Sequence, residues 1–399
     1  MKSDKSTPNV PTLRFKGYTA EWDKASLSTY AKKITSKNTD NAINNVICNS
    51  AINGLIPQLE FFDKEIANDE NTSGYYIIND GDFVYNPRKS ISAPYGPVNI
   101  YKNEITGIVS PLYLCFTINN INKRFLLYRF KSPCWYRYIY LNGDSGARHD
   151  RVSIRDDVFL SQPLSIPSVD EQAKIADFLD KIEARISVQN KIIEDLKILK
   201  KELCNRHFKS IHNDSMLEYI PLKRILSERK EYCEKDGTYT HGTLSKEGVA
   251  PKSERYDRDF LVKKEDKQYK VTHYNDICYN PANLKFGVIC RNTYGDLIFS
   301  PIYVTFEISN SVYPAYMELF LTNANFIGRI RRYEQGTVYE RMAVSPEDFL
   351  SYETRMPAYE EQVKFADKIQ RIQEKIELES AILDKYQSQR KYLLNAMFI

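Results

Sequence analysis

The sequence predicts an α+β chain in which two tandem α+β modules are each followed by a long helix. Two observations predict this order: a long segment occurs twice in the chain, and each copy ends in a stretch with heptad-spaced apolar residues. The expected boundaries are 1–168 for the first module, 169–209 for the central helix, 210–357 for the second module and 358–399 for the C-terminal helix.

The duplication is clearest in the motif Pro-x-x-x-Glu-Gln-x-Lys-x-Ala-Asp. It occupies residues 167–177 and recurs at 357–367, an offset of 190 positions. The same offset relates Ser110–Phe116 to Ser300–Phe306. Tyr85-Asn86-Pro87 recurs as Tyr279-Asn280-Pro281 at an offset of 194, so the loops between the repeated segments differ in length.

Short β-rich runs bounded by turn residues predict the strands of each module. The expected strands are 81–87 and 110–118 in the first module, and 276–279, 288–291 and 298–306 in the second. The aromatic stretches 122–140 and 314–333 are expected to be helical. In Phe125–Tyr140 the aromatic residues favour a core role over a nucleic-acid surface, and the mixed charges of Lys263–Lys267 favour a solvated surface.

Composition excludes several classes of protein. The 399 residues carry a net charge of only +4, so any affinity for nucleic acid must come from local patches. The seven cysteines form no Cys-x-x-Cys pair and no zinc-finger spacing, which favours reduced thiols and no metal. Without an apolar N-terminal segment or a run of about 18 apolar residues, a soluble cytoplasmic protein with no membrane contact is expected.

The two helical segments share a narrow apolar seam with alternating steps of four and three residues. Such a seam needs a partner helix, and the other copy is the nearest candidate. Pseudo-two-fold symmetry would then make the pair an antiparallel coiled-coil spacer, with the polar midpoints Gln189 and Glu379 opposite each other. Ser168 and Glu171 predict a capping box for the first helix, whereas the second has Ala358 at the cap. The helix-interface residues are Ile175, Leu179, Ile182, Ile186, Gln189, Ile193, Leu196 and Leu203 in the first helix, and Phe365, Ile369, Ile372, Ile376, Glu379, Leu383, Tyr386 and Leu393 in the second.

This arrangement resembles the specificity subunit of type I restriction–modification enzymes. The resemblance rests on PSVDEQAKIA at 167–176, PAYEEQVKFA at 357–366, and Pro11-x-Leu13-Arg14-Phe15 followed by Trp22. It implies two target-recognition domains that each read one half of a bipartite sequence in the major groove of double-stranded DNA. It also implies that the helices dock two methyltransferase subunits, which restriction subunits with ATP-dependent translocase and nuclease activity join. S-adenosylmethionine would be bound by the methyltransferase subunits, and this chain would need no cofactor.

Candidate DNA-contacting residues come from two loops at matching places in each module. Phosphate contacts need basic or small polar groups, and base edges favour Arg, Asn, Gln and Lys. Arg151 and Arg341 occur in both copies, which favours a structural or phosphate-binding role; ordinary solvated loop charge is the alternative for every candidate. The candidates are Asn86, Arg88, Lys89, Arg148, His149 and Arg151 in the first module, and Asn280, Asn283, Lys285, Gln335, Tyr339 and Arg341 in the second.

No motif supports catalysis. The sequence has no phosphate-binding loop, no H-E-x-x-H and no G-x-S-x-G, and its five histidines are scattered. The Tyr-Asn-Pro pair resembles half of the Asn-Pro-Pro-Tyr motif of adenine methyltransferases, but it is interpreted as a turn. A non-catalytic DNA-reading subunit is therefore expected. The alternatives are a protein–protein scaffold built on the coiled coil, which would lack salt-dependent DNA binding, and a detached recognition half of a fused methyltransferase–endonuclease.

Overall fold

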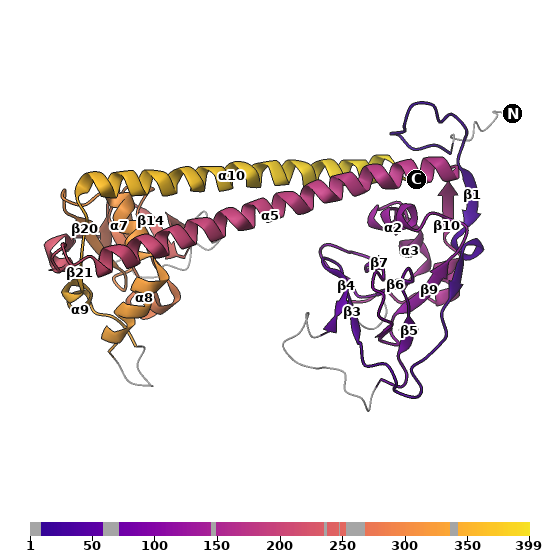
Figure 1. Ribbon diagram of the computed structural model, residues 1–399, viewed down its shortest axis with the longest axis horizontal. Coiled ribbons are helices and arrows are strands. Elements are labelled where there is room, and N and C mark those ends of the chain that lie inside the picture. The colour runs from indigo at the N-terminus through magenta and orange to yellow at the C-terminus, as the bar shows by residue number, and fades with distance from the viewer. Residues whose placement is uncertain are drawn as a thin grey trace. The chain divides into compact units, whose positions relative to one another are not determined.

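The computed structural model describes residues 9–58, 72–144, 149–234, 238–246, 248–252, 268–335 and 342–399 (Figure 1). The chain divides into two compact units. Unit 1 combines Met1–Asn190 with Ala381–Ile399, and unit 2 is Lys191–Ser380. The sequence-based boundaries separated the modules from the helices. The compact units instead divide both helices near their midpoints, because each module is grouped with the helical segments nearest to it.

The module of unit 1 is centred on a four-stranded antiparallel sheet in the order β2-β9-β6-β7. Its strands are β2 (Ala31–Lys33), β6 (Phe83–Tyr85), β7 (Val98–Ile100) and β9 (Leu114–Ile118). Three two-stranded pairs surround it: β1 (Asp23–Ser26) with β10 (Pro163–Ile166), β3 (Ile47–Ser50) with β4 (Gly54–Pro57), and β5 (Tyr76–Ile78) with β8 (Gly107–Val109). The helices are η1 (Leu27–Thr29), α2 (Lys123–Lys131), α3 (Tyr136–Asn142) and α4 (Asp156–Leu160).

The module of unit 2 has a similar four-stranded central sheet. In place of two of the small two-stranded pairs it also has a five-stranded sheet. Its four-stranded sheet has the order β12 (Leu226–Glu228), β20 (Val304–Ile308), β17 (Ile277–Tyr279) and β18 (Ile289–Arg291). A five-stranded sheet has the order β13 (Tyr232–Cys233), β16 (Tyr269–Thr272), β19 (Leu297–Phe299), β14 (Thr240–Ser245) and β15 (Gly248–Pro251). β11 (Ile220–Pro221) pairs with β21 (Glu353–Thr354), and the helices are η3 (Leu222–Arg224), η5 (Pro281–Phe286), α7 (Pro314–Leu321), α8 (Ala324–Ile330), η6 (Arg331–Tyr333) and α9 (Pro346–Ser351).

The same aromatic stack fills both cores, which is the structural counterpart of the sequence duplication. The Tyr85 ring stacks on Phe159 with centroids 4.3 Å apart, and the Tyr279 ring stacks on Phe349 at 4.9 Å. Each tyrosine ends its strand, β6 or β17, and the following Asn-Pro leaves the sheet. The interpretation of Tyr-Asn-Pro as a strand end followed by a turn is therefore confirmed.

Two strand predictions need correction. Residues 298–306 were expected to form one strand, but β19 ends at Phe299 and β20 begins at Val304 in a different sheet. Between them the Tyr303 amide donates to the Ser300 carbonyl at 3.1 Å, closing a turn that contains Pro301. A matching turn delays the start of β9 to Leu114. Proline has no N–H for a strand ladder, so the repeated Ser-Pro interrupts the extended chain.

The helical predictions for 122–140 and 314–333 are confirmed, although the first stretch forms two helices and the second forms two α-helices followed by the 3-10 turn η6. Ser132 ends α2 before Pro133, and the Asn323 side chain caps the start of α8. Most of the aromatic stretch is core, as expected: Phe125–Phe130, Trp135 and Ile139 are buried, with Arg129 only 3% exposed. Lys263–Lys267 lie outside the described residues.

The long helices are α5 (Val169–Asn213) and α10 (Tyr359–Ala396), so the first runs four residues beyond its predicted end. Their antiparallel packing is confirmed in each unit separately. In unit 1 Ile175 shares a buried cluster with Leu393, and in unit 2 Phe208 shares one with Ile369. All sixteen predicted interface residues are buried or half-buried, including the polar midpoints Gln189 and Glu379 at 7% and 8% exposure.

The repeated Glu-Gln motif joins each helix to its own module. The Gln172 amide group donates to the Pro167 carbonyl at 2.9 Å, and its oxygen accepts from the Asn122 amide at 2.9 Å, just before α2. Gln362 makes the same two bonds at 2.9 Å, to the Pro357 carbonyl and from the Tyr313 amide before α7. Each glutamine therefore ties a long helix to the first module helix that packs beside it.

The capping box predicted for α5 forms only in part. The Ser168 hydroxyl accepts from the Glu171 amide at 3.4 Å. The Glu171 carboxylate is instead held by Arg14, with both oxygens 2.7 Å from guanidinium nitrogens. The adjacent Leu13 amide donates to the Ala396 carbonyl at 2.9 Å. The N-terminal Pro11–Phe15 segment thus bridges the start of α5 and the end of α10 within unit 1.

The antiparallel direction can be tested by disulfide formation. In a background with the seven native cysteines replaced, Ile175→Cys with Leu393→Cys should crosslink efficiently, because the two residues share one cluster and a disulfide needs Cα atoms within about 7 Å. The Ile175→Cys, Phe365→Cys pair is the matched control and should remain reduced. Efficient crosslinking of the control pair, read on non-reducing gels, would refute the antiparallel arrangement.

Gln172 and Gln362, the junction glutamines that join each long helix to its module, should contribute far more to stability than other glutamines of the same helices. Gln172→Ala or Gln362→Ala leaves a buried carbonyl and a backbone amide without partners, which should lower the free energy of unfolding by about 1–3 kcal/mol. Gln389→Ala, at an exposed position of α10, should cost less than about 0.5 kcal/mol. Urea denaturation followed by circular dichroism measures both; equal effects would remove the special role of the motif.

Candidate nucleic-acid interface

In unit 1 the structure brings the two predicted loops together. Arg88 and Arg151 form an isolated antiparallel β-bridge. On either side of it the Lys89 amide donates to the Asp150 carbonyl at 2.8 Å, and the Val152 amide donates to the Pro87 carbonyl at 2.9 Å. These backbone bonds hold two loops that are distant in sequence as one surface. Arg148 lies outside the described residues, and His149 is exposed beside the bridge.

Asn86 has a structural place at the base of this surface. Its amide group donates to the Asn49 carbonyl at 3.1 Å, and its side-chain oxygen accepts from the Arg88 amide at 3.0 Å. Asn49 in turn donates to the Val84 carbonyl at 2.8 Å and accepts from Asn99 at 2.7 Å. This network of amide side chains joins the Asn86 loop to the β3–β4 hairpin and orients Arg88 and Lys89 outward.

The hairpin and the two loops enclose a cleft of about 430 Å³. Among the described residues lining it, the charged ones are Arg88, Lys89 and Arg151, and none is acidic. Arg88 approaches Asp150 at 3.7 Å, but both side chains are at least half exposed, so this ion pair is weak. Burial raises the pKa of the Cys48 thiol in the cleft, which keeps it uncharged. The cleft therefore offers positive charge and polar donors to a ligand.

The cleft also includes residues that the sequence analysis did not select. Asn53 and Ile52 lie at the tip of the β3–β4 hairpin, where the Ile52 side chain is 83% exposed. Asn53-Gly54 is a strong signal for a tight hairpin turn, and Gly54 has the positive φ of 75° that such turns use. Attention to this dipeptide between two apolar runs would have identified the hairpin.

Unit 2 brings its matching loops together with different side chains. The Val344 amide donates to the Pro281 carbonyl at 3.4 Å, a bond that resembles the Val152–Pro87 bond but is made two residues farther along the repeat. Asn280 is 8% exposed, and its side-chain oxygen caps η5 by accepting from the Ala282 and Asn283 amides. Lys285 lies on η5 with its ammonium 5.2 Å from the Phe286 ring centre, and Gln335 donates to Asp348 at 2.9 Å. Tyr339 and Arg341 lie outside the described residues.

Comparison with known proteins agrees with this geometry. Residues 23–197 match the family described as type I restriction modification DNA specificity domain. A chain from a structure of complex assembly and conformational transition of the type I R-M system aligns with a TM-score of 0.60 at 12% identity, covering 95% of this chain and 98% of the other. The S subunit from M. genitalium aligns with a TM-score of 0.53 at 14% identity, covering 98% and 99%. The HsdS subunit from Thermoanaerobacter tengcongensis aligns with a TM-score of 0.50 at 12% identity, covering 94% and 96%. No curated protein matches the sequence.

The first part of the chain thus resembles a type I restriction modification DNA specificity domain, and the chain as a whole shares the fold of these solved S subunits. The family match covers the first module and most of α5, and the low-identity structural likeness extends the same fold over the second copy. Both matches agree with the resemblance inferred from the sequence.

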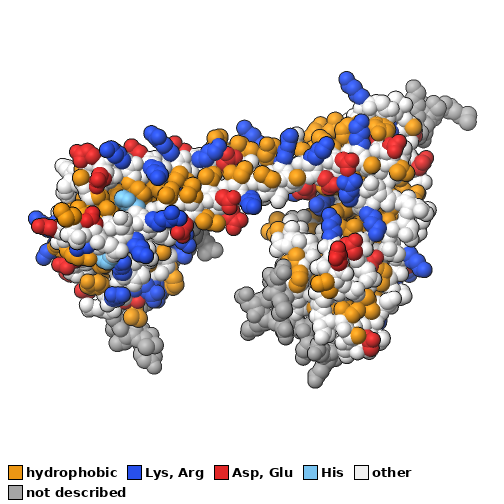
Figure 2. All heavy atoms as spheres, viewed as in Figure 1, with side chains coloured by type: hydrophobic (Ala, Val, Ile, Leu, Met, Phe, Trp, Pro, Cys, Tyr) orange, Lys and Arg blue, Asp and Glu red, His pale blue; other side chains and the backbone are white. Residues whose placement is uncertain are grey.

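The outer faces of α5 and α10 carry exposed apolar residues in addition to the buried seam. In unit 1 these include Val188, 59% exposed, and Tyr392, 62% exposed. In unit 2 they include Ile198, Leu199 and Leu378, each between 47% and 55% exposed. Figure 2 shows hydrophobic side chains along the surface of the helical segments. The predicted seam residues hold the helices together, so these outer residues are the ones available to a partner.

The described part of the chain meets neither the requirement for a three-residue metal site nor that for a membrane-spanning helix. No group of three or more His, Cys, Asp or Glu side chains there is placed to hold a metal ion. Nor does any helix among the described residues have the length and apolarity needed to cross a membrane.

Proposed function

We propose that this chain is a sequence-specific subunit for double-stranded DNA that recognises a bipartite target and directs methyltransferase and restriction subunits to it. The observation that carries the proposal is the basic cleft of unit 1, assembled from two loops and a hairpin around Arg88, Lys89 and Arg151. A DNA-specificity domain needs such a surface, because affinity comes largely from phosphate neutralisation and specificity from base edges.

The cleft residues divide by chemistry into two groups. Arg88 and Lys89 are exposed or half-exposed and can reach phosphates or guanine edges. Asn53 supplies an amide for base edges, and the exposed Ile52 supplies an apolar contact of the kind that a thymine methyl group accepts. Asn86, whose amide group is engaged with the protein backbone, is assigned to positioning Arg88 and Lys89.

We infer from the different surfaces of the two modules that each module recognises its own half-site. Each module joins its two loops by a backbone bond from a valine amide to the proline carbonyl of its Asn-Pro, but unit 1 presents Arg88 and Lys89 where unit 2 presents the helical turn η5 with Lys285. Readers that share a core and differ at the surface suit two unlike half-sites. Arg151 and Arg341, present in both copies, are proposed to bind phosphate, which is common to every sequence.

The partner subunits are assigned to the helices. Exposed apolar side chains on the outer faces of α5 and α10 suit a stable protein interface. We assign this interface to two methyltransferase subunits, which would carry S-adenosylmethionine, and restriction subunits would join through them.

Removing charge from the cleft should weaken DNA binding and reduce its dependence on salt. Arg88→Ala with Lys89→Ala should lower affinity about tenfold and reduce the slope of log affinity against log salt by about 0.9 for each phosphate that is no longer neutralised. Lys24→Ala with Lys32→Ala removes the same charge from exposed positions outside the cleft and should change affinity less than about twofold. Fluorescence anisotropy with a labelled duplex measures both; equal losses would exclude the cleft as the DNA site, and salt-independent binding would favour a protein scaffold.

Module exchange should change one half-site only. Lys24 and Ser165 face each other in the β1–β10 register, so replacing residues 24–165 with the matching module of another specificity subunit keeps the two ends paired. Sequencing of methylated sites in a host carrying the exchanged chain and its methyltransferase should show one altered half and one unaltered half. A change in both halves, or in neither, would contradict modular recognition.

A further inference from the structure

Unit 2 contains a second basic cavity, formed where the C-terminal end of α5 meets α8 and β21. Its volume is about 420 Å³. Lys209 and His212 come from α5, Arg329 comes from α8, and Tyr352 and Arg355 flank β21. No acidic side chain is among the described residues that line it. The predicted DNA-contacting residues of this unit that the structure describes, Asn280, Asn283, Lys285 and Gln335, do not line the cavity.

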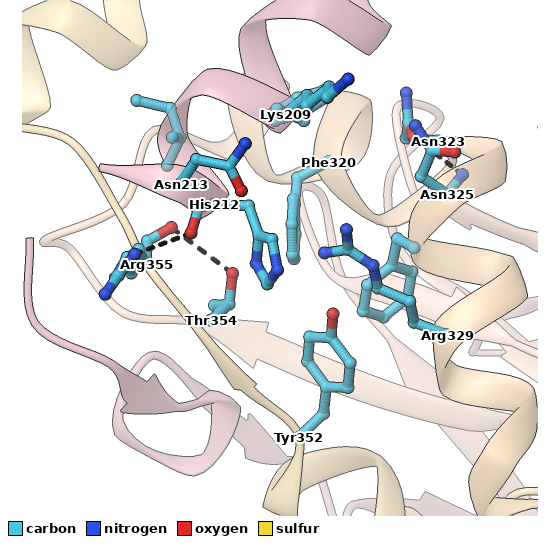
Figure 3. Close-up of a pocket in the computed structure, with 13 residues that line it drawn as sticks. Lys209, His212, Asn213, Phe320, Asn323, Asn325, Arg329, Tyr352, Thr354 and Arg355 are labelled. Carbon is cyan, nitrogen blue, oxygen red and sulfur yellow. Dashed lines mark hydrogen bonds between the residues drawn. The ribbon is translucent and has the colours of Figure 1, made fainter. Parts of the chain in front are cut away.

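Three side chains define the centre of the cavity. Arg329, His212 and Tyr352 point toward one another from different elements, and Thr354 lies beside them (Figure 3). Arg355 lies at the edge, where it donates to the His212 carbonyl at 2.7 Å and covers the Tyr219 ring with its guanidinium carbon 4.1 Å from the ring centre. Cationic and hydroxyl donors therefore converge on one space without a carboxylate to balance them.

Arg355, at the edge of the cavity, has a donor without an acceptor in the described part of the chain. Arg355 Nε is buried and has no hydrogen-bond acceptor among the described residues. A buried guanidinium N–H normally has an acceptor, because leaving it unpaired costs its full desolvation energy. Burial together with the nearby Arg329 and Arg355 also lowers the pKa of His212. Both features indicate uncompensated positive potential that an anion would relieve.

We propose that this cavity binds a free nucleotide, with the phosphate held between Arg329, His212 and the hydroxyls of Tyr352 and Thr354. Guanidinium and hydroxyl donors are the usual partners of phosphate oxygens. A volume of about 420 Å³ exceeds what a bare phosphate would fill and lies in the range of small-molecule sites. Phe320, which is half-buried in the wall, offers a ring for stacking, and Asn213 and Asn325 offer amides for the edge of a base.

The protonation of His212 gives the binding a defined pH dependence. The groups facing it are Lys209 on its own helix, Arg329, Arg355, and the rings of Tyr352 and Tyr219. In the free protein its pKa lies below the usual histidine value, so it is neutral near neutral pH. A bound anion raises that pKa, so binding takes up a proton in the window between the free and bound pKa values. Affinity must therefore fall as the pH rises through this window.

The test is calorimetric titration of the full-length chain with adenosine 5′-monophosphate, inorganic phosphate and adenosine. The monophosphate should bind more tightly than either phosphate or adenosine alone. Arg329→Gln should weaken its binding about tenfold or more, the usual effect of losing a charge-assisted hydrogen bond. Arg332→Gln, an exposed arginine outside the cavity, is the matched control and should change affinity less than about twofold. Thermal melting of each variant confirms that it is folded.

Titration with sulfate separates the protonation of His212 from that of the ligand, because sulfate keeps its charge while the pH changes. Its affinity should fall with rising pH in the natural chain and become pH-independent in His212→Asn. Absence of saturable monophosphate binding, equal affinity for adenosine, or an unchanged affinity in Arg329→Gln would each overturn the proposal. Displacement of the monophosphate by a short DNA duplex would also overturn it, because the cavity would then belong to the path of DNA.

Discussion

The structure depends on one repeated interaction, the double hydrogen bond of the junction glutamines. Gln172 and Gln362 each join the proline before a long helix to the start of the first module helix packed beside it. Because both partners are backbone groups, the bond positions one chain segment against another whatever the surrounding side chains. A narrow apolar seam is satisfied only when both helices leave their modules in the correct direction, so the seam of α5 and α10 relies on these two residues.

Stability and recognition are separated within each module. The stacked aromatic core recurs almost unchanged, with Tyr85 on Phe159 in one copy and Tyr279 on Phe349 in the other. The segments that leave this core differ: Asn86 enters a network of amide side chains, whereas Asn280 caps a helical turn. A repeated core can therefore support two unlike surfaces. The proposed recognition of two unlike half-sites requires such an arrangement.

Charge acts here through its placement and not through its total. Some cationic side chains are buried and bonded within a module: Arg129 donates to Gln162 at 2.8 Å, and Lys270 is paired with Glu228. Others, such as Arg151 in unit 1 and Arg329 in unit 2, line clefts that have no acidic side chain among their described lining residues. A net charge of +4 is compatible with both arrangements, so composition could not distinguish a DNA-binding chain from an ordinary soluble one.

The sequence by itself determined the duplication, the helix seam and its polar midpoints, and the turn after each Tyr-Asn-Pro, because these are periodic or local patterns. It also identified the loops of the candidate site. Only the tertiary structure decided that the backbones of Arg88 and Arg151 form a β-bridge and that Arg14 binds Glu171. It also decided that the side chains of Asn86 and Asn280 bond to the backbone. The physical reason is range: a seam or a turn depends on neighbours along the chain. Which distant donor meets which acceptor depends on how strands and loops of unequal length pack around the aromatic core.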